Sequence, residues 1–298
     1  MNAIVAAPVV ETVKNVFNFS VDKFPLSGPD NMRTEWFGLF RSDTSKPVGT
    51  GSVTSRYVPH QTDDVLALVE SAAEAFDGIG EVKCHFRDGH YVTVQPSRDF
   101  RKNIFGTMDN IFPRVVIRAG YDMRAFNASI GFWRDLCLNL GRLASVRGTS
   151  VRINHTSGLR SKMDELINTF GQLRNGWDAL ATTAARLESQ RVSMVDFLDQ
   201  VYGQPVAGET TRAVTIHENR TKAIFNRLAN ERAKMGKPAM TAGSRFEVSA
   251  WEAFNAIQGY TQHDATRRGN PGDFDRILLA AEDSAVLKAE SLVMALAS

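Results

Sequence analysis

The stretch VKCHFRDGHYVTV, residues 82–94, carries two short runs of strand-forming residues on either side of Asp88-Gly89. Asp-Gly between two such runs is the strongest short-range signal of a β-hairpin, because its tight turn needs two residues that tolerate positive φ. The stretch therefore predicts strands over Val82–Phe86 and Tyr91–Val94, and it marks this part of the chain as β structure.

Similar patterns extend outward from this hairpin toward both ends of the chain. We expect a helix that begins at Thr62 and ends near Gly78, because apolar residues recur there at helical spacing. Two more strand pairs are expected, Thr34–Arg41 with Val48–Val53, and Val115–Arg118 with Ala125–Trp133. After about residue 155 the apolar spacing becomes helical, with Ser193 capping one helix. On another helix, Trp251, Phe254 and Ile257 are expected in the core or in a subunit interface. The fold class is α+β, with hairpins plus a helix in the N-terminal half and a helical C-terminal half.

Composition limits the class of protein. The 298 residues are 43% hydrophobic and 23% charged, which is typical of globular domains. No apolar run approaches the roughly 18 residues of a membrane span, and the N-terminus lacks a basic leader, so we expect a cytoplasmic protein with no membrane partner. The two cysteines, Cys84 and Cys137, exclude a disulfide scaffold.

Motif searches give no cofactor or metal. Gly236-Lys237 lacks the upstream glycine of a nucleotide-binding P-loop, so ATP-driven chemistry is not expected. His217-Glu218 lacks the second histidine of a zinc-peptidase helix. We therefore predict neither a cofactor nor catalytic residues.

Charge is distributed unevenly along the chain. Residues 98–162 contain twelve basic and four acidic side chains, a net charge of +8, whereas the rest of the chain has a net charge of −6. Most of these cations are arginines, whose guanidinium groups bind phosphate oxygens with two parallel hydrogen bonds. The basic candidates are Arg98, Arg101, Lys102, Arg114, Arg118, Arg124, Arg134, Arg142, Arg147, Arg152, Arg160 and Lys162.

Aromatic residues alternate with these cations. We expect Tyr121, Phe126 and Trp133 to stack on bases, and His155 to contact a phosphate at a strand-to-helix junction. Arginines that follow a backbone and rings that stack on bases are what a single-stranded nucleic acid requires. The competing interpretation is a solvated surface of arginines with the aromatics in the core. We favour single-stranded DNA as partner, with residues 1–155 as a basic binding region and residues 156–298 supporting homo-oligomer assembly.

A family resemblance adds a biological setting. The residues Val48-Gly49, Tyr57-Val58-Pro59-His60-Gln61, Arg134, Cys137, Asn139, His155-Thr156 and Trp251 to His263 resemble the phage/plasmid-like protein family of unknown function. This resemblance implies a phage, prophage or plasmid protein in a bacterial host cell and assigns no catalytic residue. The order of strands and helix over 115–144 is also similar in pattern to phage single-strand annealing proteins. That similarity implies ATP-independent annealing of complementary strands in phage recombination by a ring-forming homo-oligomer.

Two alternatives remain open. The first is a phage-encoded interaction protein that inhibits a host factor through the basic face. The second is a Mg²⁺-dependent nuclease, because Asp30 followed by Glu81-Val82-Lys83 has the carboxylate and Glu-x-Lys layout of one nuclease class.

Overall fold

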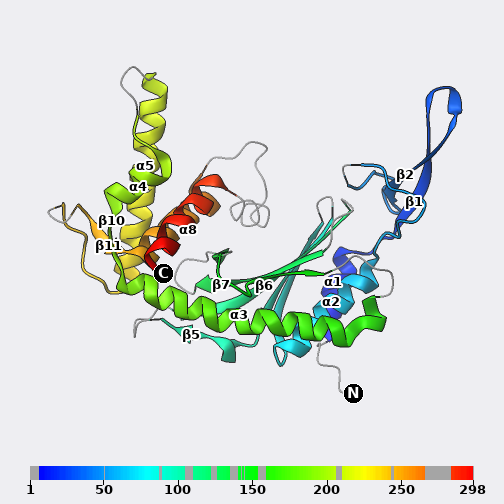
Figure 1. Cartoon of the computed structure of the whole chain (residues 1–298), viewed down its shortest axis with the longest axis horizontal. Helices are drawn as coiled ribbons and strands as arrows, with labels where there is room; N and C mark the ends of the chain where they lie inside the picture. The colour runs from blue at the N-terminus through cyan, green and yellow to red at the C-terminus, as the bar shows by residue number, and fades with distance from the viewer. Residues whose placement is uncertain are drawn as a thin grey trace. The chain divides into compact units, whose positions relative to one another are not determined.

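The protein has an α+β fold in the computed structural model, which describes residues 7–49, 51–86, 89–104, 110–121, 126–134, 140–141, 143, 145–153, 159–205, 210–242, 245–265 and 283–297. Most strands precede residue 154 and most helices follow residue 159, as the sequence predicts (Figure 1). Within these described ranges, no helix is both long and apolar enough to cross a bilayer.

The helices and strands have the following bounds. The strands are β1 (Val21–Ser27), β2 (Arg33–Arg41), β3 (Ile79–Phe86), β4 (Gly89–Pro96), β5 (Lys102–Asn103), β6 (Asn110–Gly120), β7 (Phe126–Arg134), β8 (Leu140–Gly141), β9 (Ser150–Ile153), β10 (Arg191–Ser193) and β11 (Glu247–Ser249). The α-helices are α1 (Ala7–Val16), α2 (Thr62–Ala75), α3 (Met163–Ser189), α4 (Met194–Tyr202), α5 (Thr211–Lys234), α6 (Ala250–Gly259) and α8 (Ser284–Ala297). Short 3-10 turns are η1 (Pro29–Asn31), η2 (Arg98–Phe100) and η3 (Leu159–Lys162), and η5 (Tyr260–Asp264) is a π-helix.

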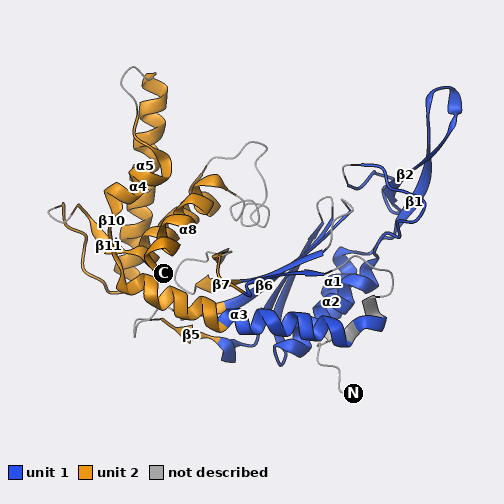
Figure 2. Ribbon diagram, viewed as in Figure 1, with its two compact units in different colours: residues 1–100, 113–130, 148–177 blue, residues 101–112, 131–147, 178–298 orange. Residues whose placement is uncertain are grey.

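The chain forms two compact units (Figure 2). Unit 1 comprises residues 1–100, 113–130 and 148–177, and unit 2 comprises residues 101–112, 131–147 and 178–298. The boundary expected at residue 155 falls inside unit 1. Strands β6 and β7 and helix α3 each contribute residues to both units, so no single cut in the sequence separates them.

The main sheet has the strand order β3-β4-β6-β7-β8, with β9 also paired to β7 and β5 to β6. The predicted hairpin of residues 82–94 is confirmed as β3 and β4, paired from Val82↔Val94 to Phe86↔His90. Gly89 begins β4 where β6 passes closely, and a Cβ there would lie 2.8 Å from the Ala119 carbonyl oxygen. A glycine at this position allows the two strands to approach.

Helices cover one side of the unit 1 strands. α2 begins with a capping box in which the Gln61 backbone amide donates to the Asp64 carboxylate at 2.8 Å, and nine of the fourteen helix residues are buried. At the end of α1, the Phe17 ring meets the His90 ring of β4 edge-on at 4.4 Å. The first half of α3 lies beside the end of α2, where Arg174 donates to the Ala75 carbonyl at 3.2 Å. We call the side of the sheet that faces α1 and α2 the inner side.

The pairing of Thr34–Arg41 differs from the prediction. This segment is β2, and its strand partner is β1. The predicted partner Val48–Val53 also contacts β2, through a hydrogen bond from the Val48 amide to the Leu39 carbonyl at 2.9 Å and an isolated bridge between Val53 and Phe37. β1 was not predicted as a strand, because Pro25 interrupts the short run VDKFPLS. The result is a two-stranded ribbon in the N-terminal part of unit 1.

Unit 2 is built around α6, of which every residue is buried. The prediction that Trp251, Phe254 and Ile257 are core residues is confirmed, and the Trp251 ring lies 4.8 Å from Phe132 of β7. Ser193 caps α4 by accepting from the Asp196 amide, as predicted. The last described helix of unit 2, α8, begins at Ser284.

Candidate nucleic-acid interface

Alternation along the unit 1 strands sorts side chains between two opposite faces. On β7, Phe126 points to the inner side, where its ring lies 4.9 Å from His60, so the next residue, Asn127, points to the other side. Asn127 pairs with Arg152 of β9, and both side chains are exposed. Near this end of the strands the outward residues are polar and exposed or half-buried, whereas the outward residues Thr93, Val116 and Ser129 further along are buried.

The inner face contains a buried group of rings. His60 Nε2 and His90 Nδ1 share a hydrogen bond of 2.9 Å, and the Tyr121 hydroxyl donates to the His60 carbonyl at 2.9 Å. Burial, together with the charge of Arg41, lowers the pKa of His90 to about 3. His90 is therefore neutral at physiological pH, and the group of rings forms part of the core.

The outer face brings cations and rings together. On β4 the outward residue Tyr91 pairs with Arg118 of β6, whose guanidinium lies 5.6 Å from the Tyr91 ring centre. On the other side of β4, His85 of β3 pairs with the same tyrosine. We define the outer sheet surface as six residues that point away from α1 and α2 and that are exposed or half-buried: Lys83, His85, Tyr91, Arg118, Asn127 and Arg152.

One carboxylate moderates the positive charge of this face. Glu81 Oε2 lies 3.2 Å from Arg114, and Oε1 of the same carboxylate lies 3.4 Å from Lys83. Partial burial alone would raise the pKa of Glu81, but the charges of Arg114 and Lys83 outweigh it and lower that pKa. Glu81 is the one acidic residue at an outward position among the described parts of β3, β4, β6, β7 and β9. These positions keep a net charge of +3 once Arg118 and Arg152 are included.

Four predicted contact residues are buried. Arg114 is 3% exposed and bonds to Glu81, and Arg134 is 1% exposed and bonds to Glu231 at 2.9 Å. Tyr121 and Phe126 belong to the inner face and are at most 2% exposed. In this structure the arginines are held by carboxylates and the rings are core, as in the competing interpretation of the sequence, so we leave these four out of the surface.

The remaining predicted residues are dispersed. Arg118 and Arg152 come together on the outer sheet surface of unit 1. Exposed side chains lie elsewhere at Arg98 and Lys162 in unit 1, and at Arg101, Lys102 and Arg147 in unit 2, and Trp133 of unit 2 is half-buried. Lys102 forms an ion pair with Asp178 at 3.0 Å. Arg124, Arg142 and His155 lie outside the described residues, and of Arg160 only the backbone, in η3, is described.

Three residues of the surface were not predicted, namely Lys83, His85 and Tyr91. They precede residue 98, so the basic segment identified by charge does not include them. The signal for them was present in the hairpin itself, because Lys83, His85 and Tyr91 occupy alternate positions on its two strands.

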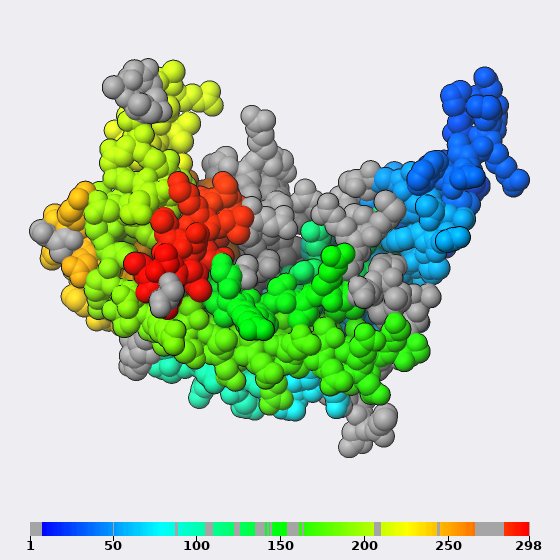
Figure 3. Space-filling model, in the orientation of Figure 1, coloured from blue at the N-terminus to red at the C-terminus, as the bar shows by residue number. Residues whose placement is uncertain are grey.

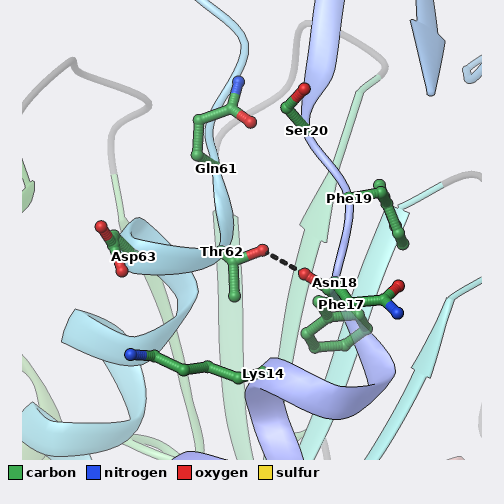
Figure 4. Close-up of a pocket in the computed structure, with 8 residues that line it drawn as sticks. All are labelled: Lys14, Phe17, Asn18, Phe19, Ser20, Gln61, Thr62 and Asp63. Carbon is green, nitrogen blue, oxygen red and sulfur yellow. Dashed lines mark hydrogen bonds between the residues drawn. The ribbon is translucent and has the colours of Figure 1, made fainter. Parts of the chain in front are cut away.

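Unit 1 also has a pocket of about 450 Å³ at the start of α2 (Figure 4). Lys14 and Asp63 lie at its rim, and the Thr62 hydroxyl donates to the Phe17 carbonyl across it. The capping box already uses the amide of Gln61 and the side chain of Asp64 at this helix end. We assign no ligand to this pocket.

The nuclease residues do not come together. Asp30 lies in the turn η1 at the tip of the β1–β2 ribbon, whereas Glu81 lies near the start of β3. The base of the ribbon is near the opposite end of β3, where Phe19 and Phe86 meet at 4.8 Å. Within the described ranges, no three histidine, cysteine or acidic side chains are grouped as metal ligands. Burial also raises the pKa of Cys84 to about 12, which leaves its thiol protonated.

The fold and surface thus define an α+β protein with exposed cations on part of the outer sheet face. Residues 50–282 match the family described as "Domain of unknown function (DUF932)", and the chain belongs to this family. Neither the curated proteins nor the solved structures include a significant match. The family fits the expected family of unknown function and assigns no activity.

Proposed function

We propose that this protein binds single-stranded DNA on the outer sheet surface of unit 1. The observation that carries the proposal is the pairing of Tyr91 with Arg118 in the middle of a face that also presents Lys83 and Arg152. A strand laid across this face has cations for its phosphates and a ring for a base, which is how sequence-independent binding to single strands is achieved. An open sheet face suits unpaired bases, because they are free to lie flat on it.

We further propose that the bound strand is annealed to its complement without ATP. Base pairing supplies the free energy of annealing, so the protein has only to reduce the repulsion between the two phosphate backbones. Several subunits that hold neighbouring stretches of one strand would keep its bases accessible, and we therefore propose a homo-oligomer, with a ring as the expected form. The setting in phage or plasmid recombination is proposed from the family resemblance stated above.

The binding experiment is a salt titration with a labelled single-stranded oligonucleotide, followed by fluorescence anisotropy. The variant Arg118→Ala/Arg152→Ala removes two exposed cations from the surface. Each lost phosphate contact lowers the slope of log affinity against log salt by about 0.7 for single strands, so we expect a total decrease of about 1.4. Affinity at low salt should fall by roughly one order of magnitude or more.

The matched control is Arg212→Ala/Lys222→Ala, which removes two exposed cations from α5 in unit 2. It changes the net charge of the chain by the same amount, so any effect of net charge alone appears in both variants. A sheet variant that binds with the affinity and salt slope of the control would exclude the outer sheet surface as the binding site.

Annealing is measured with two complementary oligonucleotides that carry a donor and an acceptor dye. We expect the wild-type chain to accelerate the appearance of energy transfer in the absence of ATP, and the sheet variant to lose most of this acceleration. Binding without acceleration would limit the function to binding. An RNA oligonucleotide in the same assay measures the preference between DNA and RNA.

A further inference from the structure

The β1–β2 ribbon has two faces that differ in their contacts. On one face Lys23 donates to the carbonyls of Ser55 and Tyr57, at 2.6 and 2.9 Å, and Leu39 is 2% exposed. Residues 51–58 of the same chain therefore cover this face. The ribbon extends away from the sheet and helices of unit 1 (Figures 1 and 3).

The opposite face is apolar and uncovered by any described residue of the chain. Phe24 pairs with Gly38, so both residues share this face with Trp36, two positions away along β2. Phe24 is 53% exposed and Trp36 is 50% exposed. Phe40 meets the Phe24 ring at 5.8 Å, and a Cβ on Gly38 would lie 2.7 Å from Phe40 and 3.1 Å from Leu26. The absence of a side chain at Gly38 thus lets its neighbours form one continuous apolar face, which comprises Phe24, Leu26, Trp36 and Phe40.

The net charge of the ribbon indicates which class of partner its apolar face binds. Between residues 21 and 41 the ribbon has three basic and three acidic side chains, so its net charge is zero. The one ionised group on the apolar face is Asp22 at its base, which accepts from the Ser20 hydroxyl at 3.0 Å. A neutral aromatic face offers nothing to a phosphate backbone, but aromatic residues are enriched in the centres of protein interfaces.

We propose that the apolar face of the ribbon packs against the same face of a second copy of this chain. Two ribbons without net charge approach each other without repulsion, and a two-fold contact needs only one self-complementary face. A two-stranded ribbon is also marginally stable in water by itself, so a partner sheet on its open face stabilises it.

The small area of the face sets the strength of the contact. A half-exposed aromatic ring buries roughly 100 Å² more on contact, so the two half-exposed rings of each copy contribute about 200 Å². Stable complexes bury about 800 Å² per partner. The ribbon contact is therefore weak and reversible, and it forms only at high concentrations of the chain.

The test is sedimentation velocity of the full chain, without nucleic acid, from low micromolar to several hundred micromolar concentration. The wild-type chain should show a sedimentation coefficient that rises with concentration, and Phe24→Ser/Trp36→Ser should stay monomeric over the same range. The matched control Ile216→Ser removes a side chain of equal exposure, 52%, from α5 and should behave as the wild type.

A second variant keeps the ribbon's own contacts intact. Trp36→Arg places two like charges opposite each other across the two-fold contact, so it should also stay monomeric, and added salt should partly restore its association. A wild-type chain that is monomeric throughout, or ribbon variants that associate like the wild type, would overturn the proposal. The measurement contains no DNA, so its failure would leave the proposed binding on the outer sheet surface untouched.

Discussion

The inner and outer faces of the unit 1 sheet are made from the same strands, and near the end of β6 and the start of β7 neighbouring residues have opposite surroundings. On β7, Phe126 is buried against His60, whereas Asn127 is exposed opposite Arg152. On β6, Ala119 is buried and Arg118 is exposed. A cationic stretch of sequence is therefore not the same as a cationic surface, because strand geometry assigns each residue to one face or the other.

The largest expected effect on stability comes from creating a cavity on the inner face. Phe126→Ala removes a fully buried ring, and we expect the free energy of unfolding to fall by about 3–5 kcal/mol. The neighbouring Asn127→Ala, on the outer face, should change it by less than about 0.5 kcal/mol. Urea unfolding followed by circular dichroism measures both. Equal losses for the two variants would contradict the assignment of faces.

Arg134 is a buried cation of β7, and its replacement tests whether its ion pair with Glu231 stabilises the fold. Arg134→Met leaves the Glu231 carboxylate buried without this cation, and breaking such a pair costs about 3–5 kcal/mol. The double variant Arg134→Met/Glu231→Leu should recover most of that loss, because both charges of the pair are gone and Arg227, the other cation near Glu231, keeps its ion pair with Asp264 at 2.7 Å. Urea unfolding measures the free energy of unfolding of both variants. Arg147→Met, at an exposed position, is the control and should be as stable as the wild type. A single variant as stable as the control would show that Arg134 does not depend on Glu231.

Much of the fold was predictable because its signals are local. The hairpin at 82–94 follows from its Asp-Gly turn, and the helix at 62–75 follows from apolar spacing and its cap. The pairing of β2 with β1 was not predictable, because Pro25 masks the strand.

The site was less predictable, because the fate of each cation depends on distant partners. Arg114 and Arg118 are four residues apart on one strand and point to the same side, yet only Arg114 is buried, next to Glu81. The partner of Arg134 is Glu231, which is 97 residues away. No pattern within the basic segment reports such pairings, whereas strand alternation in the hairpin would have identified Tyr91.

Mild acidification acts on a buried histidine of the inner face. The pKa of His90 is about 3 in the folded chain, below its unfolded value near 6.5, so between these pH values the unfolded state binds more protons. Stability is therefore fully present above pH 6.5 and falls as the pH is lowered, by at most about 1.4 kcal/mol per pH unit from this group. The free energy of unfolding measured between pH 7 and pH 5, where most carboxylates stay ionised, should fall less steeply in His90→Asn. Parallel pH profiles for the two proteins would show that His90 is not the group responsible.

The smallest expected effect is on DNA affinity and comes from the Tyr91 ring on the outer face. Tyr91→Ala should weaken binding of a single-stranded oligonucleotide by about 1–3 kcal/mol, because stacking of one base on an aromatic side chain is worth that much. Tyr91→Phe keeps the ring and should bind like the wild type. Because Tyr91 carries no charge, Tyr91→Ala should leave the salt slope unchanged, which separates it from Arg118→Ala/Arg152→Ala, where the slope itself falls. A loss of affinity in Tyr91→Phe as large as that in Tyr91→Ala would assign the effect to the hydroxyl and remove stacking from the proposed mode of binding.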